Sequence, residues 1–145
     1  MLTLENNKVE IERIGDYGVT EEIKSLIKNS GLDEPFDWIN CKHIITGRYN
    51  DELIGIVVYG EIRTKIETLP RFLHAILSPK YKRTKKALYL MIYSEKEIKK
   101  LGYKQILVFL NKDLNNKEMK EKYALEFGYK EYADTSDGKF YYKNI

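Results

Sequence analysis

Residue types that build metal sites and disulfides are scarce in this chain. Its 145 residues include one cysteine, Cys41, and two histidines, His43 and His74. A single cysteine excludes an intrachain disulfide and a four-thiolate zinc site, and two histidines leave few ligands for any other metal centre. We therefore expect no metal cofactor, and a reducing, cytoplasmic setting is the expected localisation.

Long apolar runs and linker segments are also missing. No apolar run approaches the roughly 20 residues that span a bilayer, and the amino terminus does not read as a signal peptide. The chain shows no internal repeat, no low-complexity tract and no Pro/Gly/Ser-rich linker. The sequence therefore predicts a single domain over residues 1–145, without a membrane partner.

Charge is abundant but unevenly distributed. Hydrophobic residues make up 43% of the chain, enough for a core, and the formal net charge is only +3. Residues 1–40 nevertheless carry nine acidic and four basic side chains, a balance of −5, whereas residues 80–104 carry nine basic and two acidic ones, a balance of +7. A local basic excess of this size suits a phosphate-bearing ligand, either a nucleotide cofactor or a nucleic acid backbone.

Apolar periodicity predicts strands that alternate with helices. Expected strands lie at 9–14, 43–49, 53–62, 72–77, 105–110, 130–133 and 139–142, with turns at 16–18 and 50–52. Expected helices lie at 20–29, 33–41, 84–101 and 115–127, where Thr20 and Asn115 are the predicted caps of the first and last. The order β-α-α-β-β-β-α-β-α-β-β predicts an α/β (α+β) fold with a mixed sheet in three layers. The helix between the strands at 72–77 and 105–110 implies a parallel crossover.

Four segments carry a more specific signal. They are Asn-Asp-Glu-Leu-Ile-Gly at 50–55, Ala-Ile-Leu-Ser-Pro-Lys-Tyr-Lys-Arg at 75–83, Lys-Lys-Leu-Gly-Tyr-Lys-Gln-Ile at 99–106 and Phe-Gly-Tyr-Lys at 127–130. In this order and spacing, they resemble motifs of the GNAT superfamily of acyl-CoA-dependent N-acyltransferases, and the resemblance covers essentially the whole chain. It implies a GNAT-like fold that moves an acetyl group from acetyl-CoA to an amine of a small molecule or protein. The acidic amino-terminal part would border the acceptor groove, which suggests a cationic acceptor, although ordinary surface carboxylates explain these residues equally well.

The resemblance also places a phosphate-binding loop before the third predicted helix. Members of the family have Gln/Arg-x-x-Gly-x-Gly/Ala there, and this chain has 82–87, with Lys85 at the central glycine. Two interpretations follow. Either the helix amides and the basic side chains bind the pyrophosphate together, or the Lys85 side chain blocks the loop and the basic run is a solvated helix start. The cofactor contacts implied by the resemblance are Ile76, Leu77, Arg83, Thr84, Lys85, Lys86, Ala87, Asn111 and Asn116.

Direct attack by an amine on a thioester needs a base for the ammonium proton and an acid for the leaving thiolate. His74 and Glu61 are the candidate bases, because a histidine titrates near neutral pH and a carboxylate can do so when its pKa is raised. The family's acid is a tyrosine of the last helix. The family spacing Asn-x₆-Tyr, counted from Asn116, reaches Tyr123. The family segment Tyr-x-x-x-Gly-aromatic, counted back from Gly128, instead reaches Ala124, which lies about 100° away around a helix. Tyr123 is otherwise a core aromatic between Met119 and Phe127.

A second function also fits the sequence. The chain is then a catalytically inactive GNAT-fold binding protein whose basic face around 80–104 holds a nucleic acid or an acidic partner. Tyr81, Tyr89, Tyr93 and Tyr103 interleave with the basic residues, as aromatic platforms for single-stranded nucleic acid do. The same tyrosines also fit the boundary of an amphipathic helix, which makes nucleic acid the less favoured partner. Monomer and homodimer are equally compatible with the sequence.

Overall fold

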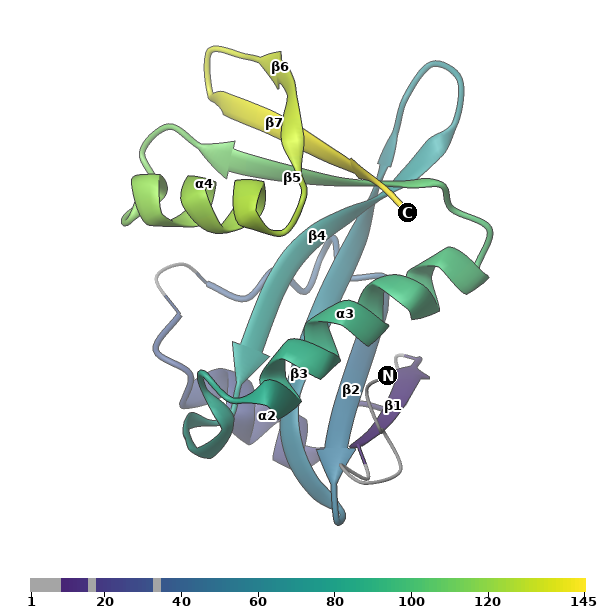
Figure 1. Ribbon diagram of the computed structural model, residues 1–145, viewed down its shortest axis with the longest axis vertical. Coiled ribbons are helices and arrows are strands. Elements are labelled where there is room, and N and C mark those ends of the chain that lie inside the picture. Colours follow the sequence, from purple (N-terminus) through teal and green to yellow (C-terminus); the bar gives the residue numbers. More distant parts are fainter. Residues whose placement is uncertain (1–8, 16–17, 33–34) are drawn as a thin grey trace.

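The computed structural model describes residues 9–15, 18–32 and 35–145, and it contains one seven-stranded mixed sheet (Figure 1). The strand order across the sheet is β1-β2-β3-β4-β5-β7-β6. The strands are β1 (Val9–Ile14), β2 (His43–Tyr49), β3 (Glu52–Arg63), β4 (Thr68–Leu77), β5 (Gln105–Asn111), β6 (Lys130–Asp134) and β7 (Gly138–Asn144). The helices are α2 (Glu21–Lys28), α3 (Lys85–Lys100), α4 (Lys117–Glu126) and the short 3₁₀ helix η2 (Pro79–Tyr81).

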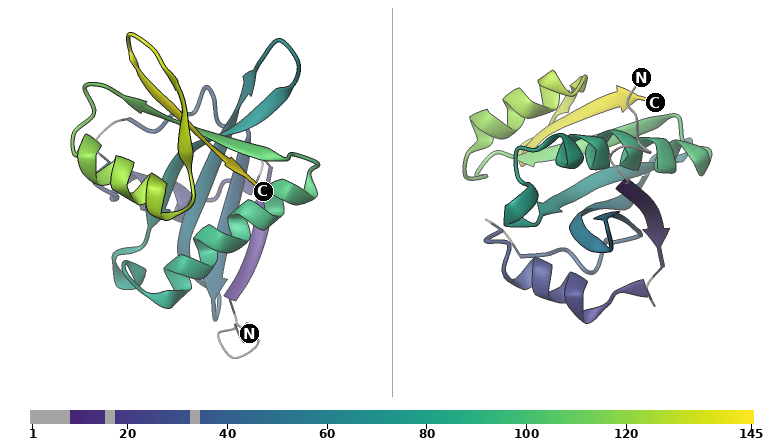
Figure 2. Two further views of the ribbon diagram at one scale, coloured as in Figure 1. Left: turned by 45° about the horizontal axis from the view of Figure 1, so that its top comes forward. Right: turned by 60° about the horizontal axis from the view of Figure 1, so that its bottom comes forward.

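The helices cover the sheet on both faces, so the molecule has the predicted three layers. Helices α3 and α4 lie on one face and α2 lies on the other (Figure 2). On the α3 face, Leu90 and Ile98 pack with Ile45 and Val57 of the sheet in one core cluster. On the α2 face, Ile23 packs in a second cluster that includes strand residues of β2, β3 and β4. None of the helices among the described residues is long and apolar enough to cross a membrane.

The β2–β3 hairpin shows why the first half of the sheet forms where the sequence predicts it. Asn50 and Asp51 have φ angles of 48° and 65°, which is the geometry of a two-residue type I′ turn. Asn and Asp tolerate the left-handed region better than most residues, so this pair fits the turn. The strands then pair antiparallel from Tyr49↔Glu52 back to His43↔Tyr59.

Strands β4 and β5 are parallel, as predicted, but they pair only briefly. Their register consists of Arg71↔Leu107 and Phe72↔Val108. Beyond this point β4 continues along β3, whereas β5 pairs with β7 over its whole length. The two strands therefore diverge, and residues 73–77 of β4 have no strand partner on the β5 side.

The predicted helix at 33–41 is wrong over its described part. Residues 35–41 form no helix, and the predicted start, Asp33, lies outside the described residues. The Asp37 carboxylate accepts hydrogen bonds from the Asn40 backbone N–H at 3.0 Å and from Asn40 Nδ2 at 2.8 Å. Because this side chain satisfies the local backbone in a turn, it competes with a helix. Residues 16 and 17 of the predicted first turn also lie outside the described residues.

Helix α4 departs from its prediction in two ways. Its N-cap is Asn116, with φ 57° and no side-chain capping bond, so the predicted capping box at Asn115 does not form. The helix has no buried residue, and Tyr123 is 52% exposed, so its interpretation as a core aromatic is wrong. Ala124, one position further on, packs against the main core instead.

Candidate functional site

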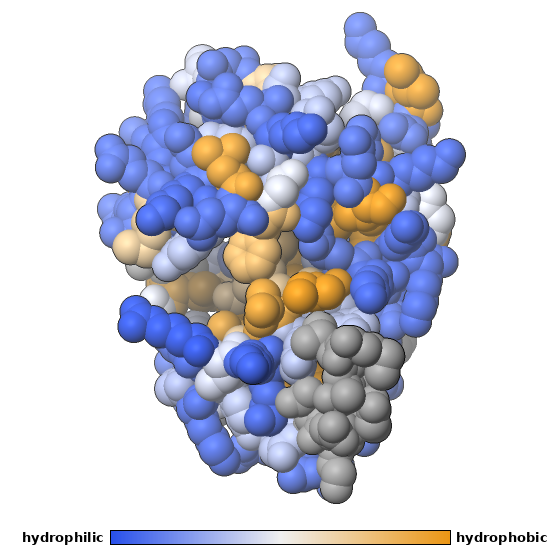
Figure 3. All heavy atoms as spheres, viewed as in Figure 1, coloured by the Kyte–Doolittle hydropathy of each residue, from blue (hydrophilic) through white to orange (hydrophobic). Residues whose placement is uncertain are grey.

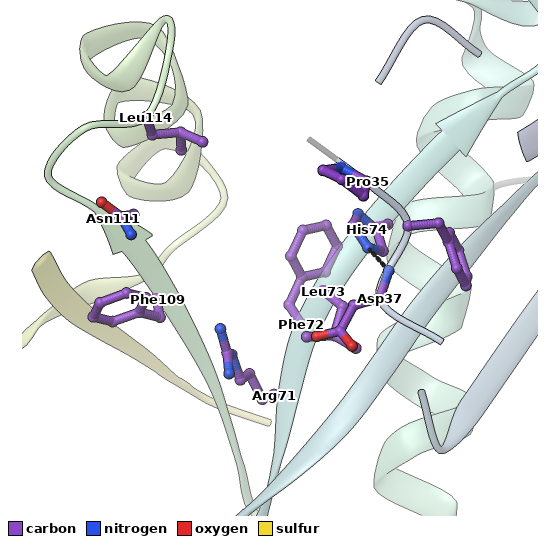
Figure 4. Close-up of a pocket in the computed structure, with 10 residues that line it drawn as sticks. Pro35, Asp37, Arg71, Phe72, Leu73, His74, Phe109, Asn111 and Leu114 are labelled. Atoms are coloured by element: carbon purple, nitrogen blue, oxygen red, sulfur yellow. Dashed lines mark hydrogen bonds between the residues drawn. The ribbon is translucent and has the colours of Figure 1, made fainter. Parts of the chain in front are cut away.

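A cavity of about 390 Å³ opens where β4 and β5 separate. Its walls come from three parts of the chain: the segment 35–37, the middle of β4, and the end of β5 with the loop after it (Figure 4). The residues that line it are Pro35, Phe36, Asp37, Arg71, Phe72, Leu73, His74, Phe109, Asn111 and Leu114. The space-filling view of the α3 and α4 face shows apolar side chains gathered in a hollow between these two helices (Figure 3).

A β-bulge in β4 decides which side chains face this cavity. Phe72 pairs with Tyr59 and His74 pairs with Val58, so Leu73 is an extra residue in β4. Phe72 packs against the core cluster on the α3 face, whereas Leu73 packs against the cluster on the α2 face. Arg71 precedes Phe72 in regular alternation and therefore points to the α2 face.

His74 holds the segment 35–37 against β4. Its Nε2 accepts a hydrogen bond from the Asp37 backbone N–H at 3.1 Å (Figure 4). Its ring stacks on Phe36, with centroids 4.8 Å apart. The imidazole is 6% exposed. An Nε2 that accepts a hydrogen bond carries no proton, so its lone pair is engaged in this arrangement.

Asp37 brings a negative charge to the same wall of the cavity. The hydrogen bonds from Asn40 lower the pKa of the Asp37 carboxyl, and the nearby positive charge of Arg71 lowers this pKa further. The carboxyl is therefore ionised at neutral pH. Asn40 binds both carboxylate oxygens, Oδ1 through its backbone N–H and Oδ2 through its amide.

Arg71 brings a positive charge, and none of the described acidic residues forms an ion pair with it. Its guanidinium lies over the Phe109 ring, with Cζ 5.7 Å from the ring centroid (Figure 4). Its Nε is buried without a hydrogen-bond partner, and within the described ranges no hydrogen bond or ion pair is formed by this side chain. A cation in this state is available to a ligand in the cavity.

The start of α3 is the second feature of the site. Thr84 is the N-cap: its Oγ1 donates to the Tyr81 carbonyl at 2.6 Å and accepts from the Ala87 N–H at 3.3 Å. The Leu88 N–H binds the Thr84 carbonyl at 3.2 Å. In the described part of the chain, this leaves the amides of Lys85 and Lys86 to bind an anion.

The absent glycine causes no backbone strain at Lys85. Lys85 is the first residue of α3, and the residue of this loop with a positive φ is Arg83, at 62°. Arg83 and Lys85 are exposed, and Lys86 places Nζ 4.3 Å from the centroid of the Tyr49 ring. The helix start therefore keeps its free amides and adds cationic side chains around them.

The charges at this helix start are the reverse of the usual pattern. The first turn of α2 contains Glu21 and Glu22, which suit the positive end of the helix dipole. The first turn of α3 contains no acidic residue and has Lys85 and Lys86 instead. Lysines there are repelled by the helix dipole, and a bound anion relieves this repulsion.

Other predicted cofactor contacts are distributed between the two features. Ile76 and Leu77 lie on the part of β4 that has no partner on the β5 side, and the Ile76 side chain is buried. Asn111 lines the cavity, and its Oδ1 accepts a hydrogen bond from the Asp113 N–H at 2.9 Å. Asn116 is the N-cap of α4, has a left-handed backbone conformation and does not line the cavity.

Of the three predicted catalytic residues, His74 lines the cavity, and Glu61 and Tyr123 do not. Glu61 accepts a hydrogen bond from the Tyr103 hydroxyl at 2.9 Å. Tyr123 lies on an exposed face of α4. Within the described ranges, no three His, Cys, Asp or Glu side chains gather in a way that could hold a metal ion.

The tyrosines of the basic segment do not form an open stacking surface. Tyr81 and Tyr89 are buried. Tyr93 is half-buried beneath Lys96, whose Nζ lies 4.5 Å from the ring centroid. Tyr103 binds Glu61 through its hydroxyl. This arrangement fits the interpretation that these rings sit at amphipathic boundaries.

Sequence reasoning did not identify Arg71, Asp37 or Phe109 as site residues. The missed signal was the position of Arg71, a charged residue within an otherwise apolar stretch of β4. Charged side chains are seldom placed in buried strands unless they pair with something. Asp37 gave no comparable signal, because its contact with the site depends on the turn that replaces the predicted helix.

Three solved structures illustrate what this chain resembles. No family model matches the sequence, and no curated protein matches it. A GNAT-family acetyltransferase from Listeria monocytogenes is 10% identical, with a TM-score of 0.75, over 94% of this chain and 95% of that one. An acetyltransferase from Bacillus subtilis in complex with CoA is 14% identical, with a TM-score of 0.67, over 94% and 99%. The paia N-acetyltransferase from Thermoplasma acidophilum in complex with coenzyme A is 14% identical, with a TM-score of 0.62, over 94% and 99%.

The three similarities extend over nearly the full length of both proteins compared, at very low sequence identity. The chain therefore has the fold of GNAT-family acetyltransferases, as its sequence motifs predict.

Proposed function

We propose that this protein is a single-domain N-acyltransferase that moves an acetyl group from acetyl-CoA to an amine by direct attack. The observation that carries the proposal is the start of α3, the helix that follows β4 and η2. It has free backbone amides and basic side chains. The fold supports it, because proteins of this fold include acetyltransferases solved in complex with CoA.

The two features of the site suit two different parts of acetyl-CoA. The pyrophosphate suits the amides of Lys85 and Lys86 and the charge of Arg83. The chain between pyrophosphate and thioester contains two amide groups, which suit the strand edge at 73–77 that β5 leaves unpaired. The thioester then lies at the cavity, where the acceptor amine reaches it.

The reaction needs one new bond and two proton transfers. The amine nitrogen attacks the thioester carbonyl, a C–N bond forms, and the C–S bond breaks with departure of the CoA thiolate. The ammonium proton goes to a base, and the thiolate takes a proton from an acid or from water. We propose His74 as the base, because it lines the cavity and the other candidates do not. To take a proton, Nε2 must release the hydrogen bond from Asp37 N–H.

A thermal-unfolding titration with acetyl-CoA, combined with an assay for free thiol release in the presence of amines, tests this function. A ligand at 100 times its dissociation constant stabilises the folded state by about 2.7 kcal/mol. We expect a rise in Tm with acetyl-CoA and a smaller one with adenosine, which lacks the pyrophosphate. An unchanged Tm at millimolar acetyl-CoA contradicts the proposal.

The binding protein without catalysis remains the second candidate, supported by the +7 balance of residues 80–104. It predicts binding to a polyanion that weakens steeply with salt, together with no acyl transfer. A fluorescence titration with single-stranded DNA at two salt concentrations measures this binding, and the thiol-release assay measures acyl transfer. Salt-sensitive DNA binding without thiol release favours the binding protein, whereas thiol release in the presence of amines favours the acetyltransferase.

A further inference from the structure

The cavity is lined by a half-buried cation, Arg71, whose buried Nε has no partner in the described chain. Arg71 Nε is buried without a hydrogen bond, and the guanidinium contacts the face of Phe109. A polar group that loses water without gaining a partner destabilises the folded state, so such groups are seldom retained without a role. The planar guanidinium offers paired N–H donors that match a carboxylate.

Asp37 is the acidic residue that lines the cavity together with Arg71, and it does not fill this role. Both of its carboxylate oxygens bind Asn40 within the turn 37–40. The charge of Arg71 acts on Asp37 but the two side chains form no ion pair. The cavity therefore presents one positive and one negative group, each directed to the same space from a different wall (Figure 4).

The position of Arg71 assigns it to one side of the proposed reaction. Arg71 and His74 point to the α2 face, and so does Phe109, because its neighbours Val108 and Leu110 belong to the core on the α3 face. The pyrophosphate site lies at the start of α3, on the opposite face. A second substrate that enters from the α2 face meets Arg71, Asp37 and Phe109 before it reaches the thioester.

We propose that the acceptor is an amine that also carries a carboxylate, an amino-acid-like molecule whose carboxylate binds Arg71. Its amino group lies toward Asp37 and His74, and an apolar or aromatic side chain packs against Phe36 and Phe109. This proposal rests on the proposed acyl transfer and replaces a purely cationic acceptor with a zwitterionic one. Arg71 acts here as a specificity-determining residue for the acceptor.

Binding of a carboxylate can be measured without turnover. The probes are phenylacetate and its neutral isostere phenylacetamide, added to protein that carries ¹⁵N-labelled arginine. We expect the Arg71 Nε–H resonance, assigned by its loss in Arg71→Lys, to shift saturably with phenylacetate, at least about tenfold tighter than with phenylacetamide. Equal responses to the two probes, or no response to phenylacetate, overturn the proposal.

Acyl transfer provides a second readout. The acceptors are L-phenylalanine and L-phenylalaninamide, and the quantity is the ratio of their kcat/KM values in the wild type and in Arg71→Met. Comparing the two proteins cancels the different basicities of the amines. We expect the preference for the free acid to fall at least about tenfold in Arg71→Met. An unchanged ratio overturns the proposal.

Two controls keep the outcomes distinct. The acetyl-CoA dissociation constant of each variant shows that it is folded, and Arg71→Lys replaces Arg71→Met if the latter does not fold. Failure of the wild-type protein to bind acetyl-CoA contradicts the proposed function. The phenylacetate experiment then still tests whether Arg71 binds a carboxylate. Normal acetyl-CoA binding without a carboxylate preference contradicts only the assignment of Arg71.

Discussion

At the scale of single residues, Lys85 has opposite effects on stability and on ligand binding. It lies at the positive end of α3, where a cation is unfavourable and an anion is favourable. We expect Lys85→Glu to raise the stability of the free protein by about 1 kcal/mol, or about 2–4 °C in Tm. The same change is expected to weaken acetyl-CoA binding about tenfold, measured by isothermal titration calorimetry.

Lys99→Glu is the matched control, because Lys99 lies in the last turn of the same helix and undergoes the same change of charge. It is expected to lower the Tm and to leave the acetyl-CoA affinity within about twofold of the wild type, because a cation is favourable at that end of a helix. Equal losses of affinity in the two variants would mean that net charge, and not the start of α3, determines binding.

His74 combines a structural hydrogen bond with the proposed role as base. Glutamine retains an acceptor for the Asp37 N–H but does not take up a proton near neutral pH. We expect His74→Gln to keep the wild-type acetyl-CoA affinity while kcat/KM falls by about 10² to 10⁴-fold and the pH dependence of the rate is lost. A variant that transfers acetyl groups at the wild-type rate would limit His74 to holding the segment 35–37 in place.

At the scale of elements, Gly60 on β3 allows the segment that precedes β2 to cross close to the sheet. A Cβ at this position would lie 2.5 Å from the Asn40 carbonyl oxygen, which is backbone and has little room to move. We expect Gly60→Ala to lower the free energy of unfolding by about 1–3 kcal/mol and to displace the wall of the cavity formed by 35–37. Urea denaturation and the kcat/KM for the acceptor measure the two effects.

Gly47→Ala serves as the comparison on the neighbouring strand β2. The added Cβ there would meet Leu90 Cδ1 at 2.9 Å, the end of a flexible side chain that can rotate away. The variant is expected to lose less stability than Gly60→Ala and to retain acyl transfer. A larger loss at Gly47 than at Gly60 would show that the crossing at Asn40 is not a tight constraint.

The elements themselves were predictable to different degrees, for physical reasons. Strands β2 and β5 and helix α3 were predicted to within about one residue, because each has strong local periodicity and α3 is capped by Thr84. The predicted helix at 33–41 failed over 35–41 because the Asp37 side chain replaces helical hydrogen bonds with its own.

The candidate site was only partly predictable for a related reason. Arg71 and His74 are three residues apart, and regular alternation in a strand would place them on opposite faces. The extra residue Leu73 puts both on the α2 face. A bulge depends on the register with β3, which periodicity alone does not reveal. The start of α3, by contrast, could be predicted from the helical periodicity after Thr84, and the family resemblance placed a phosphate-binding loop there at 82–87.

At the scale of the whole molecule, burial differs between the edge formed by α4 and β6 and the middle of the sheet at β3. Helix α4 and strand β6 contain no buried residue, whereas β3 is almost continuously buried from Leu53 to Gly60. We expect backbone amides of α4 and β6 to exchange with deuterium faster than those of β3, because little apolar surface opposes their opening. Acetyl-CoA is expected to slow exchange at 73–77 and at the start of α3.

Hydrogen exchange followed by mass spectrometry, with and without acetyl-CoA, measures both expectations. Protection confined to other segments would place the ligand away from the opening between β4 and β5. Similar exchange in β6 and β3 of the free protein would show that the sheet opens as one cooperative unit.

The opening between β4 and β5 gives the sheet an inner edge in addition to its two outer ones. The outer strands carry charges that discourage another strand from pairing with them, namely Glu10, Glu12 and Arg13 on β1 and Lys130, Glu131 and Asp134 on β6. The inner edge at 73–77 reads Leu-His-Ala-Ile-Leu and has no Lys, Arg, Asp or Glu. Under the proposed function CoA covers this edge, so we expect CoA in the lysis buffer to raise the soluble yield of the protein.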